Sequence, residues 1–452
     1  MSILNMKVKL KALVLLTCVV SLLGGCLETS RPTPSGKGNI RALHAISDAP
    51  EVTFLIEERP LGNIAYKATT STQPFDDFTY DFRFDTRLPG DAAVRRIATR
   101  SLAVVPDTDY VFVLTGTLET PSILLWETPE RQWAGTETVL EASAAHLATT
   151  VGDVDIFLAP PGTAPAAGQE RGSLAFGERL PNFDVESGAY VLTVTASGDP
   201  ANVLFRSGSQ TLAERTSILF TIQDADPSIT SGISVRRVDQ AGTSIEIADA
   251  AVPPTRRFFH AAFGTTNLDV VVDEEFTAPV VANLAFGALS ADVPVPSGAS
   301  TYTFTQTGNP GGVLLEDEDT VVANSRSTTF VTGPPADLEV VGFADDRRSI
   351  AGLVKLRITQ VSANFEDADV YLQTAGTDIA AVNPNFPSLD SGVTTRYLQL
   401  AAGSYELTVT PTGEKTVAAG PVALDLANGD VVELAIVDTA DPNLLGVVVY
   451  DP

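Results

Sequence analysis

Segments in which apolar and polar residues alternate recur along the chain and share one starting pattern. Four stretches align without gaps, and they begin at His44, His146, His260 and Gln360. Nine residues later each stretch has a Thr or an Asp between apolar neighbours, at Thr53, Asp155, Asp269 and Asp369. A period of two predicts a β-strand with one buried face, so the Thr and Asp side chains are expected on the opposite face.

A second alternating stretch follows in each unit and contains a tyrosine. In three units a Gly precedes the Tyr, as in GAYVLTVT (188–195), GASTYTFT (298–305) and GSYELTVT (403–410). In the first unit DTDYVFVLTG (107–116) takes the same place without the Gly. The four tyrosines are Tyr110, Tyr190, Tyr302 and Tyr405. Such a Tyr is either a tyrosine corner, which bonds back to the chain, or an aromatic core residue, and both roles are architectural.

The interval between the repeats gives the size of the domain. It is about 100 residues, the length of a β-sandwich and longer than a solenoid unit. The 34 Gly and 29 Pro provide turns between short strands. We therefore predict an all-β chain of four tandem antiparallel immunoglobulin-like β-sandwiches, at 40–138, 139–247, 256–350 and 351–452, with a linker at 248–255. The segment ETVLEASAAHL before the second unit can also be interpreted as a short helix.

The N-terminus has the organisation of an export signal. Lys7, Lys9 and Lys11 precede an apolar run at 12–23, which is too short to span a bilayer, and LGGC follows, ending at Cys26. This order resembles the lipobox of bacterial lipoproteins, which implies removal of 1–25 and a diacylglyceryl group on Cys26. The polar segment 26–39 then predicts a flexible tether. The alternative is an ordinary secretory signal with an incidental cysteine.

The repeated stretches also resemble a known family. IRALHAISDAPEVTFLIE, the later LAFG, and LAAGSYELTVTPTG are similar to the bacterial domain-of-unknown-function family 4397, whose members have a His-Ala-Ser-Pro-Asp-Ala-Pro opening and a Gly-x-Tyr strand. Ile46 stands where the family has Ser, and Gln360 replaces the His in the fourth unit. The resemblance implies tandem domains in exported or lipid-anchored proteins and no particular chemistry.

Charge and cysteine content narrow the possible partners and cofactors. The formal net charge is −27, so a nucleic-acid partner is not expected. Cys18 and Cys26 are the two cysteines, and only the second would remain after cleavage, which excludes an internal disulfide. No cofactor is expected. Structural calcium at the acidic runs 76–77, 273–275, 316–319 and 345–346 is an alternative, but these runs do not have the spacing of a calcium loop.

His44, Ser47 and Asp48 lie close together in the sequence and invite a hydrolytic interpretation. Ser and Asp do not recur with the histidines of the second and third units, and the chain has no G-x-S-x-G motif. Ser47 and Asp48 are therefore interpreted as turn residues. The recurring His, or Gln360, is interpreted as a hydrogen-bond partner that fixes the loop before the next strand. The expectation is that the protein is not an enzyme and has no metal site.

These observations predict a lipid-anchored protein of the bacterial cell envelope, with the outer membrane as its expected location and Cys26 as its membrane contact. Its expected role is that of a binding, scaffold or spacer module with an unknown protein or polysaccharide partner. The alternative is a carbohydrate-binding or hydrolytic accessory with a site in one divergent domain. Trp126 and Trp133 suit that alternative, because an exposed pair can stack on a sugar ring.

Overall fold

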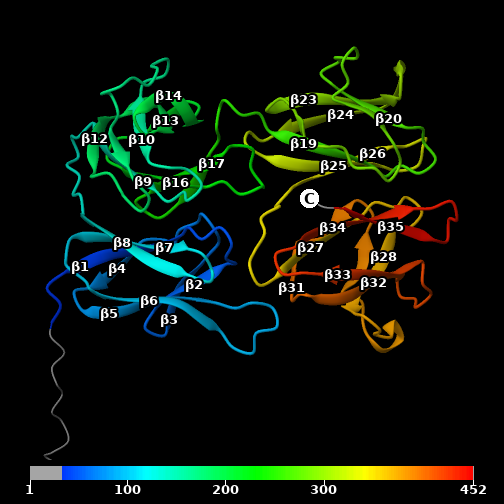
Figure 1. The fold of residues 1–452 in the computed structure, drawn as a ribbon, viewed down its shortest axis with the longest axis horizontal. Helices are drawn as coiled ribbons and strands as arrows, with labels where there is room; N and C mark the ends of the chain where they lie inside the picture. The colour runs from blue at the N-terminus through cyan, green and yellow to red at the C-terminus, as the bar shows by residue number, and fades with distance from the viewer. Residues whose placement is uncertain (1–32, 451–452) are drawn as a thin grey trace, which may run out of the picture.

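A computed structural model describes residues 33–450, and its elements are almost all β-strands (Figure 1). The predicted signal peptide (1–25) and Cys26 lie outside the described residues. Within 33–450 the one helix is a 3-10 turn, η1 (Ile379–Ala381), and no helix there has the length and apolar character to cross a membrane. The predicted all-β class is confirmed.

The strands form eight sheets, which pack in pairs as four sandwiches, numbered 1 to 4 along the chain. The sheets of sandwich 1 are, in spatial order, β4 (Gln73–Asp76), β1 (Lys37–His44), β7 (Thr108–Gly116), β8 (Pro121–Pro129), and β3 (Arg59–Ile64), β2 (Val52–Ile56), β5 (Thr79–Thr86), β6 (Arg95–Ala103). Those of sandwich 2 are β12 (Phe183–Glu186), β9 (Val139–His146), β16 (Ser217–Asp224), β17 (Ile233–Asp239), β18 (Ser244–Ile247), and β11 (Gly172–Leu174), β10 (Val154–Ala159), β13 (Gly188–Ala196), β14 (Asp199–Arg206), with β15 (Gln210–Leu212) beside β13.

Sandwiches 3 and 4 repeat this plan. The sheets of sandwich 3 are β22 (Val293–Pro294), β19 (Thr255–His260), β25 (Arg326–Thr332), β26 (Glu339–Ala344), and β21 (Val281–Leu284), β20 (Leu268–Val272), β23 (Gly298–Gln306), β24 (Asn309–Val321). Those of sandwich 4 are β30 (Val393–Thr394), β27 (Val354–Gln360), β34 (Val431–Asp438), β35 (Leu445–Tyr450), with β31 (Leu398–Leu400) beside β27, and β29 (Phe386–Asp390), β28 (Asp367–Thr374), β32 (Gly403–Pro411), β33 (Ala419–Leu426).

One strand pair in each sandwich is parallel, which differs from the purely antiparallel sheets expected. The first strand of each sandwich pairs in parallel with a later strand, as β1–β7, β9–β16, β19–β25 and β27–β34. The chain leaves its first strand, forms the whole second sheet and an edge strand of the first sheet, and then returns in the same direction beside its first strand. A crossover of this kind produces a parallel pair, which a hairpin cannot. All other strand pairs between residues 33 and 450 are antiparallel.

The segment for which a helix was an alternative is the strand β9. Ala142 and Ala144 point into the core of sandwich 2, whereas Ala145 lies in a second apolar cluster outside that core. Both faces of the strand are therefore buried. An apolar run without alternation does not distinguish a doubly buried strand from a helix, and this explains the ambiguity in the sequence.

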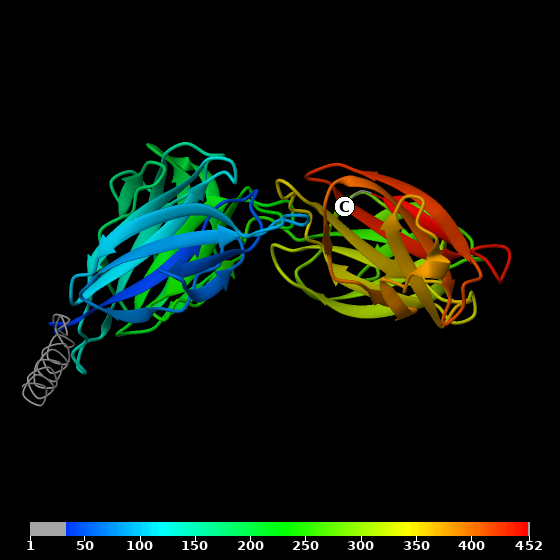
Figure 2. The ribbon, with the colours of Figure 1, turned by 90° about the horizontal axis from the view of Figure 1, so that it is seen from below.

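The outer faces of these sheets join the sandwiches into two pairs. Leu43 and Val113 of sandwich 1 pack against Leu147 of sandwich 2. The equivalent positions of the second pair, Phe259, Phe330 and Val361, pack together in the same way. The pairs 1–2 and 3–4 lie along the long axis of the molecule and meet in its middle (Figure 2). The molecule thus consists of two copies of a two-sandwich unit, and not of four separate domains arranged in a line.

Candidate functional site

The three histidines are completely buried, and each ring bonds the backbone of its own loop. Each residue is 0 % exposed, and each Nε2 donates to a carbonyl oxygen six residues later, at 3.0–3.2 Å. The acceptors are Pro50, Gly152 and Thr266. Burial lowers the pKa of all three rings, and that of His44 falls to about 4. The rings are therefore neutral at pH 7 and pin the loop between the two sheets of their sandwich.

Gln360 makes the same two kinds of contact in sandwich 4. Its Nε2 donates to the carbonyl oxygen of Phe365 at 3.2 Å, and its Oε1 accepts from the amide of Ser362 at 3.0 Å. In sandwich 1 the second role belongs to Nδ1 of His44, which accepts from the amide of Ile46 at 3.3 Å. A carboxamide presents one donor and one acceptor, as a neutral imidazole does. This is why Gln can replace His at the repeated position.

A turn closes over each of these residues and completes the motif. Its last residue donates an amide hydrogen to the carbonyl oxygen of the His or Gln, at 2.7–2.8 Å, from Lys67, Gly177, Gly287 and Gly392. The four segments are IAYK, LAFG, LAFG and LDSG, and the donor has φ between 68° and 84° in each. Gly is the natural residue there. Only LAFG was recognised from the sequence, because the first and fourth segments have the same turn conformation but different residues.

The repeated Asp positions join an edge strand to a turn in sandwiches 2, 3 and 4. One oxygen of Asp369 accepts from the amide of Ser388 at 2.9 Å, and the other from the amide of Gly413 at 3.0 Å. Asp269 also accepts from two amides, and Asp155 accepts from one amide and from a serine hydroxyl of its edge strand. These carboxylates are 4–9 % exposed, so the side chains on the face expected to be open are buried.

In sandwich 1 the carboxylate lies on the neighbouring strand, β5, instead of on β2. The Asp positions of the other sandwiches face a Thr on the neighbouring strand, whereas Thr53 faces Asp85. Thr53 donates its hydroxyl hydrogen to the Asn63 side chain at 2.9 Å. The same Thr–Asp pair is therefore present in all four sandwiches, with its two members swapped in the first.

The tyrosines do not form one equivalent set. Tyr190, Tyr302 and Tyr405 lie on β13, β23 and β32, the strands equivalent to β5, whereas Tyr110 lies on β7 in the opposite sheet. Tyr190 and Tyr405 lie five residues before the Thr of the Thr–Asp pair, as Tyr80 of β5 lies five before Asp85, whereas Tyr302 lies three residues before its Thr. Apolar alternation is the same on both strands, so sequence alignment could not separate them. Tyr405 donates to the carbonyl oxygen of Ala401, four residues earlier, as a tyrosine corner does.

The His44, Ser47 and Asp48 side chains do not form a catalytic triad geometry. Both ring nitrogens of His44 are engaged within its loop, and an oxygen of Asp48 accepts from the amide of Leu118 at 3.0 Å. The carbonyl oxygen of Ser47 accepts from Arg348 at 2.8 Å. This stretch binds distant parts of the chain through the Asp48 carboxylate and through its backbone carbonyl oxygens.

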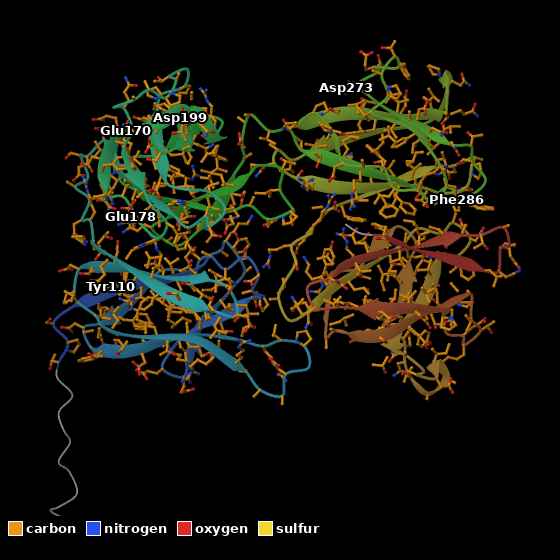
Figure 3. The ribbon with its side chains drawn as sticks, in the orientation of Figure 1. Tyr110, Glu170, Glu178, Asp199, Asp273 and Phe286 are labelled. Atoms are coloured by element: carbon orange, nitrogen blue, oxygen red, sulfur yellow. The ribbon has the colours of Figure 1, made fainter. Side chains whose placement is uncertain are left out.

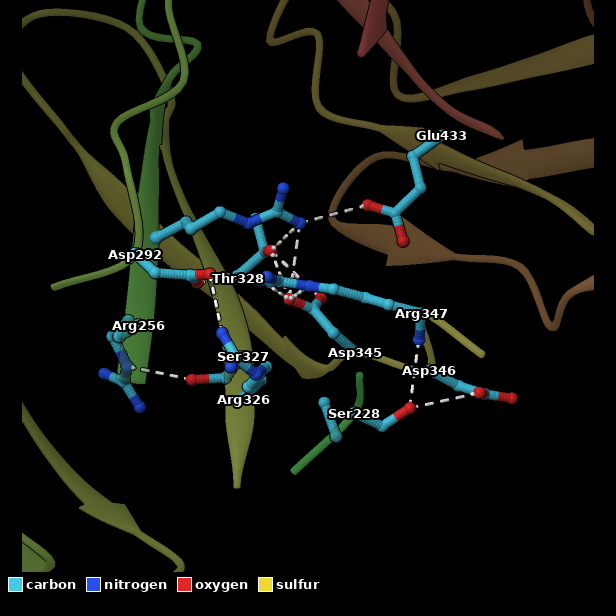
Figure 4. A network of polar contacts seen from close by, with 12 residues as sticks. Ser228, Arg256, Asp292, Arg326, Ser327, Thr328, Asp345, Asp346, Arg347 and Glu433 are labelled. Carbon is cyan, nitrogen blue, oxygen red and sulfur yellow. Dashed lines mark hydrogen bonds and ion pairs between the residues drawn. The ribbon is translucent and has the colours of Figure 1, made fainter. Parts of the chain in front are cut away.

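A buried network of charges lies between sandwiches 3 and 4 (Figure 4). Asp345, with its side chain 0 % exposed, binds Arg347 at 2.6 Å, Arg357 at 3.1 Å and Arg257 at 3.3 Å. Glu433, at 1 % exposed, also binds Arg357 and Arg257. Each carboxylate is thus surrounded by guanidinium groups from two sandwiches. A buried charge is tolerated only when it is paired in this way.

The connector 345–353 carries this network to the other two sandwiches. Arg348 donates to the carbonyl oxygens of Ser47 and Ala49, both at 2.8 Å, and lies over the ring of Tyr66. The amide of Arg347 donates to the hydroxyl of Ser228 in sandwich 2 at 3.0 Å. One short segment therefore contacts all four sandwiches.

The interface of sandwiches 1 and 2 has a different composition at the equivalent positions. By strand register, Val111 corresponds to Thr328 and Ser143 to Arg357. In the same way Leu219 corresponds to Glu433 and Trp126 to Phe343. Arg41 is equivalent to Arg257, but its guanidinium donates to the carbonyl oxygen of Asp239. At these positions the pair 1–2 has no carboxylate where the pair 3–4 has Glu433, and its own buried ion pair, Lys67 with Asp226 at 2.8 Å, lies elsewhere in the interface.

A cleft of about 810 Å³ opens beside the interface of sandwiches 1 and 2. Sandwich 1 contributes Trp126, Glu127 and Thr128 from β8, and sandwich 2 contributes residues from three segments, among them Glu141, Glu178, Arg179 and Asn182. Figure 3 places Glu178 on the side of sandwich 2 that faces sandwich 1. Trp126 is half-buried, and its Nε1 donates to the carbonyl oxygen of Gly177 at 3.3 Å, so its ring has a fixed position. This volume is that of a small-molecule site, and domain interfaces often hold such sites.

The acidic runs considered for calcium have other contacts. Asp319 pairs with Arg256, Asp345 belongs to the buried network, and Asp273 accepts from the amide of Thr301 at 2.9 Å. Among residues 33–450 no three His, Cys, Asp or Glu side chains are placed to hold a metal ion.

The fold and its repeated His turn define a class of tandem β-sandwich proteins. The family model described as "Domain of unknown function (DUF4397)" matches residues 38–157 and 255–371, and the chain belongs to this family. Each match begins in the first strand of a pair and ends in the second sandwich of that pair, in keeping with a repeated two-sandwich unit.

Two of the solved structures that are similar to this chain are remote in sequence. One is described as "Alpha-glucan binding by a streptococcal virulence factor", with 11 % identity, 40 % of this chain and 93 % of that chain covered, and a TM-score of 0.16. The other is "The Bacillus anthracis TIE protein", with 11 % identity, 90 % and 76 % covered, and a TM-score of 0.16. The comparison with curated proteins gives no match.

Proposed function

We propose that the protein is a lipid-anchored component of the bacterial cell envelope, expected at the outer membrane, and that it acts as a rigid, non-enzymatic binding or scaffold module. The observation that carries this proposal is the connector 345–353, which bonds to all four sandwiches. Sheet-to-sheet packing within each pair and the connector between the pairs leave little freedom for independent domain motion. A body of this kind holds its surfaces in a fixed relative position.

The position of the chain start supports display away from a membrane. β1 begins at the outer end of sandwich 1, and the pair 3–4 lies at the opposite end of the long axis (Figure 2). A lipid on Cys26, followed by the tether 26–39, would hold the pair 1–2 near the membrane and the pair 3–4 further out. Two or more acyl chains on one cysteine would make that attachment stable.

The local chemistry supports a role without catalysis. His44, His146 and His260 are buried, are neutral at pH 7, and bond their own loops. A general base needs access to a substrate proton, which a ring at 0 % exposure lacks. The net charge of −27 supports a partner other than nucleic acid.

Replacing the proposed anchor residue tests the location. Cys26→Ser is expected to move the protein from the membrane fraction to the soluble fraction, because the serine hydroxyl cannot accept the thioether-linked lipid. Cys18→Ser is the matched control, since Cys18 lies in the segment that would be removed, and it should leave membrane association unchanged. Fractionation and immunoblotting measure both. Membrane association that survives Cys26→Ser contradicts the proposed anchor.

A further inference from the structure

We infer that the cleft between sandwiches 1 and 2 binds an uncharged oligosaccharide, with Trp126 as the stacking platform. The inference rests on the proposed binding role and names the class of ligand. The cleft is formed by two sandwiches that are fixed against each other, so its shape exists before a ligand arrives. A preformed site avoids the cost of ordering its walls on binding.

Arg179 gives the first indication of a missing partner. Burial lowers the pKa of its guanidinium to about 10, which leaves it charged at pH 7. It forms no ion pair with any residue in 33–450, and its Nε has no hydrogen-bond partner there. Its recorded side-chain bond is to the amide oxygen of Asn182. The arginines of the other interface bind buried carboxylates, whereas Arg179 lines the cleft without a carboxylate partner in the described part of the chain, so its guanidinium is a charged donor beside the cleft.

The carboxylates of the cleft also keep unused acceptor capacity. One oxygen of Glu141 accepts from the hydroxyl of Ser217 at 3.2 Å, and one oxygen of Glu178 accepts from the amide of Ala175 at 2.8 Å. Each carboxylate has a second oxygen and further lone pairs. Glu127 is exposed at the rim. The lining thus offers a charged donor and carboxylate acceptors in the same cleft as one indole ring.

This combination selects among ligand classes. Three glutamates would repel a polyanion. Arg179 would repel the ammonium groups of a cationic peptide, and those groups cannot accept hydrogen bonds from the guanidinium. A sugar hydroxyl both donates and accepts, so neighbouring hydroxyls match an arginine beside carboxylates. The C–H face of a sugar ring is apolar and packs against an aromatic face. An uncharged oligosaccharide therefore uses every group of the lining without a like-charge contact.

The two tryptophans of the chain allow a direct test. Trp126 lines the cleft and Trp133 does not. In the full chain carrying Trp133→Phe, purified in a zwitterionic detergent, the emission comes from Trp126 alone. Titration with maltoheptaose, cellohexaose, mannohexaose and chitohexaose is expected to give a saturable change with at least one of them. The reciprocal variant Trp126→Phe, which reports from Trp133, is expected to give none.

A second pair of variants keeps the result independent of folding. Glu127→Ala changes an exposed rim residue and should weaken the binding about threefold to tenfold, the loss of one or two hydrogen bonds. Glu170→Ala, on sandwich 2 outside the cleft (Figure 3), should leave it unchanged. The inference is overturned if all four oligosaccharides leave Trp126 emission unchanged, or if heparin or octalysine changes it instead. Because the protein is in detergent, these outcomes do not depend on Cys26 and are distinct from failure of the proposed anchor.

Discussion

Replacing His44 by alanine and by glutamine separates the hydrogen bonds of the ring from its other properties. Alanine leaves the carbonyl oxygen of Pro50 and the amide of Ile46 without their partners, and both groups are buried. Each unsatisfied buried group costs about 1–3 kcal/mol, and the lost ring adds a cavity. We expect His44→Ala to destabilise sandwich 1 by about 3–5 kcal/mol. His44→Gln should cost about 1 kcal/mol, because Gln360 makes both kinds of bond in sandwich 4.

The same pair of variants predicts a pH dependence. The pKa of His44 is about 4 in the folded protein and about 6.5 when unfolded, so the unfolded chain binds the proton more tightly. Stability from the neutral ring is therefore complete above pH 6.5 and is lost as the pH falls toward 4. At pH 5 the loss is about 2 kcal/mol relative to pH 7.5. His44→Gln removes this contribution and should flatten the profile.

Urea denaturation followed by tryptophan emission measures these effects, because Trp126 lies on β8 of sandwich 1. Unfolding is recorded at pH 7.5 and pH 5 for the wild type and both variants. The reasoning is refuted if glutamine is as damaging as alanine at pH 7.5. It is also refuted if the wild type and His44→Gln lose equal stability between the two pH values.

Two further substitutions test other parts of the architecture. Asp345→Ala removes the shared partner of three arginines and should destabilise the pair 3–4 by about 3–5 kcal/mol. The expected result is a lower melting temperature, and an unchanged one would mean that the network is not a structural junction. Asp369→Asn replaces a carboxylate that accepts from two amides and should lower the free energy of unfolding by about 2–3 kcal/mol. The amides of Ser388 and Gly413 should then exchange hydrogen faster than in the wild type, and equal exchange would show that these bonds contribute little.

The repeat was predictable because each copy must build its own core. Strand alternation, the spacing of the His or Gln positions and the turn residues follow from local chemistry, so they appear in the sequence. The pairing of sandwiches was not predictable in this way. Leu43 and Phe259 face a neighbouring sandwich rather than their own core, yet an outward apolar residue looks like a core residue in the sequence.

The charged junction was hidden for a different reason. Arg257, Asp345 and Glu433 lie in three separate segments, and only the tertiary structure brings them together. The position three residues before the His or Gln was the available signal, since it holds Arg41, Ser143, Arg257 and Arg357. The cleft is equally long-range, because Trp126 and Arg179 belong to different sandwiches. The local pattern of apolar and polar residues predicts each sandwich. The contacts between sandwiches join distant segments, so that pattern does not predict them.

A distance measurement between the two pairs tests most directly whether the four sandwiches form one rigid body. In a Cys26→Ser background, Thr99→Cys on β6 and Ala423→Cys on β33 place two spin labels on exposed strands of sandwiches 1 and 4. Pulsed electron paramagnetic resonance is predicted to give one narrow distance distribution, unchanged by moderate salt. A broad distribution that spans many separations would mean that the pairs move independently, and it would contradict the proposed rigid module.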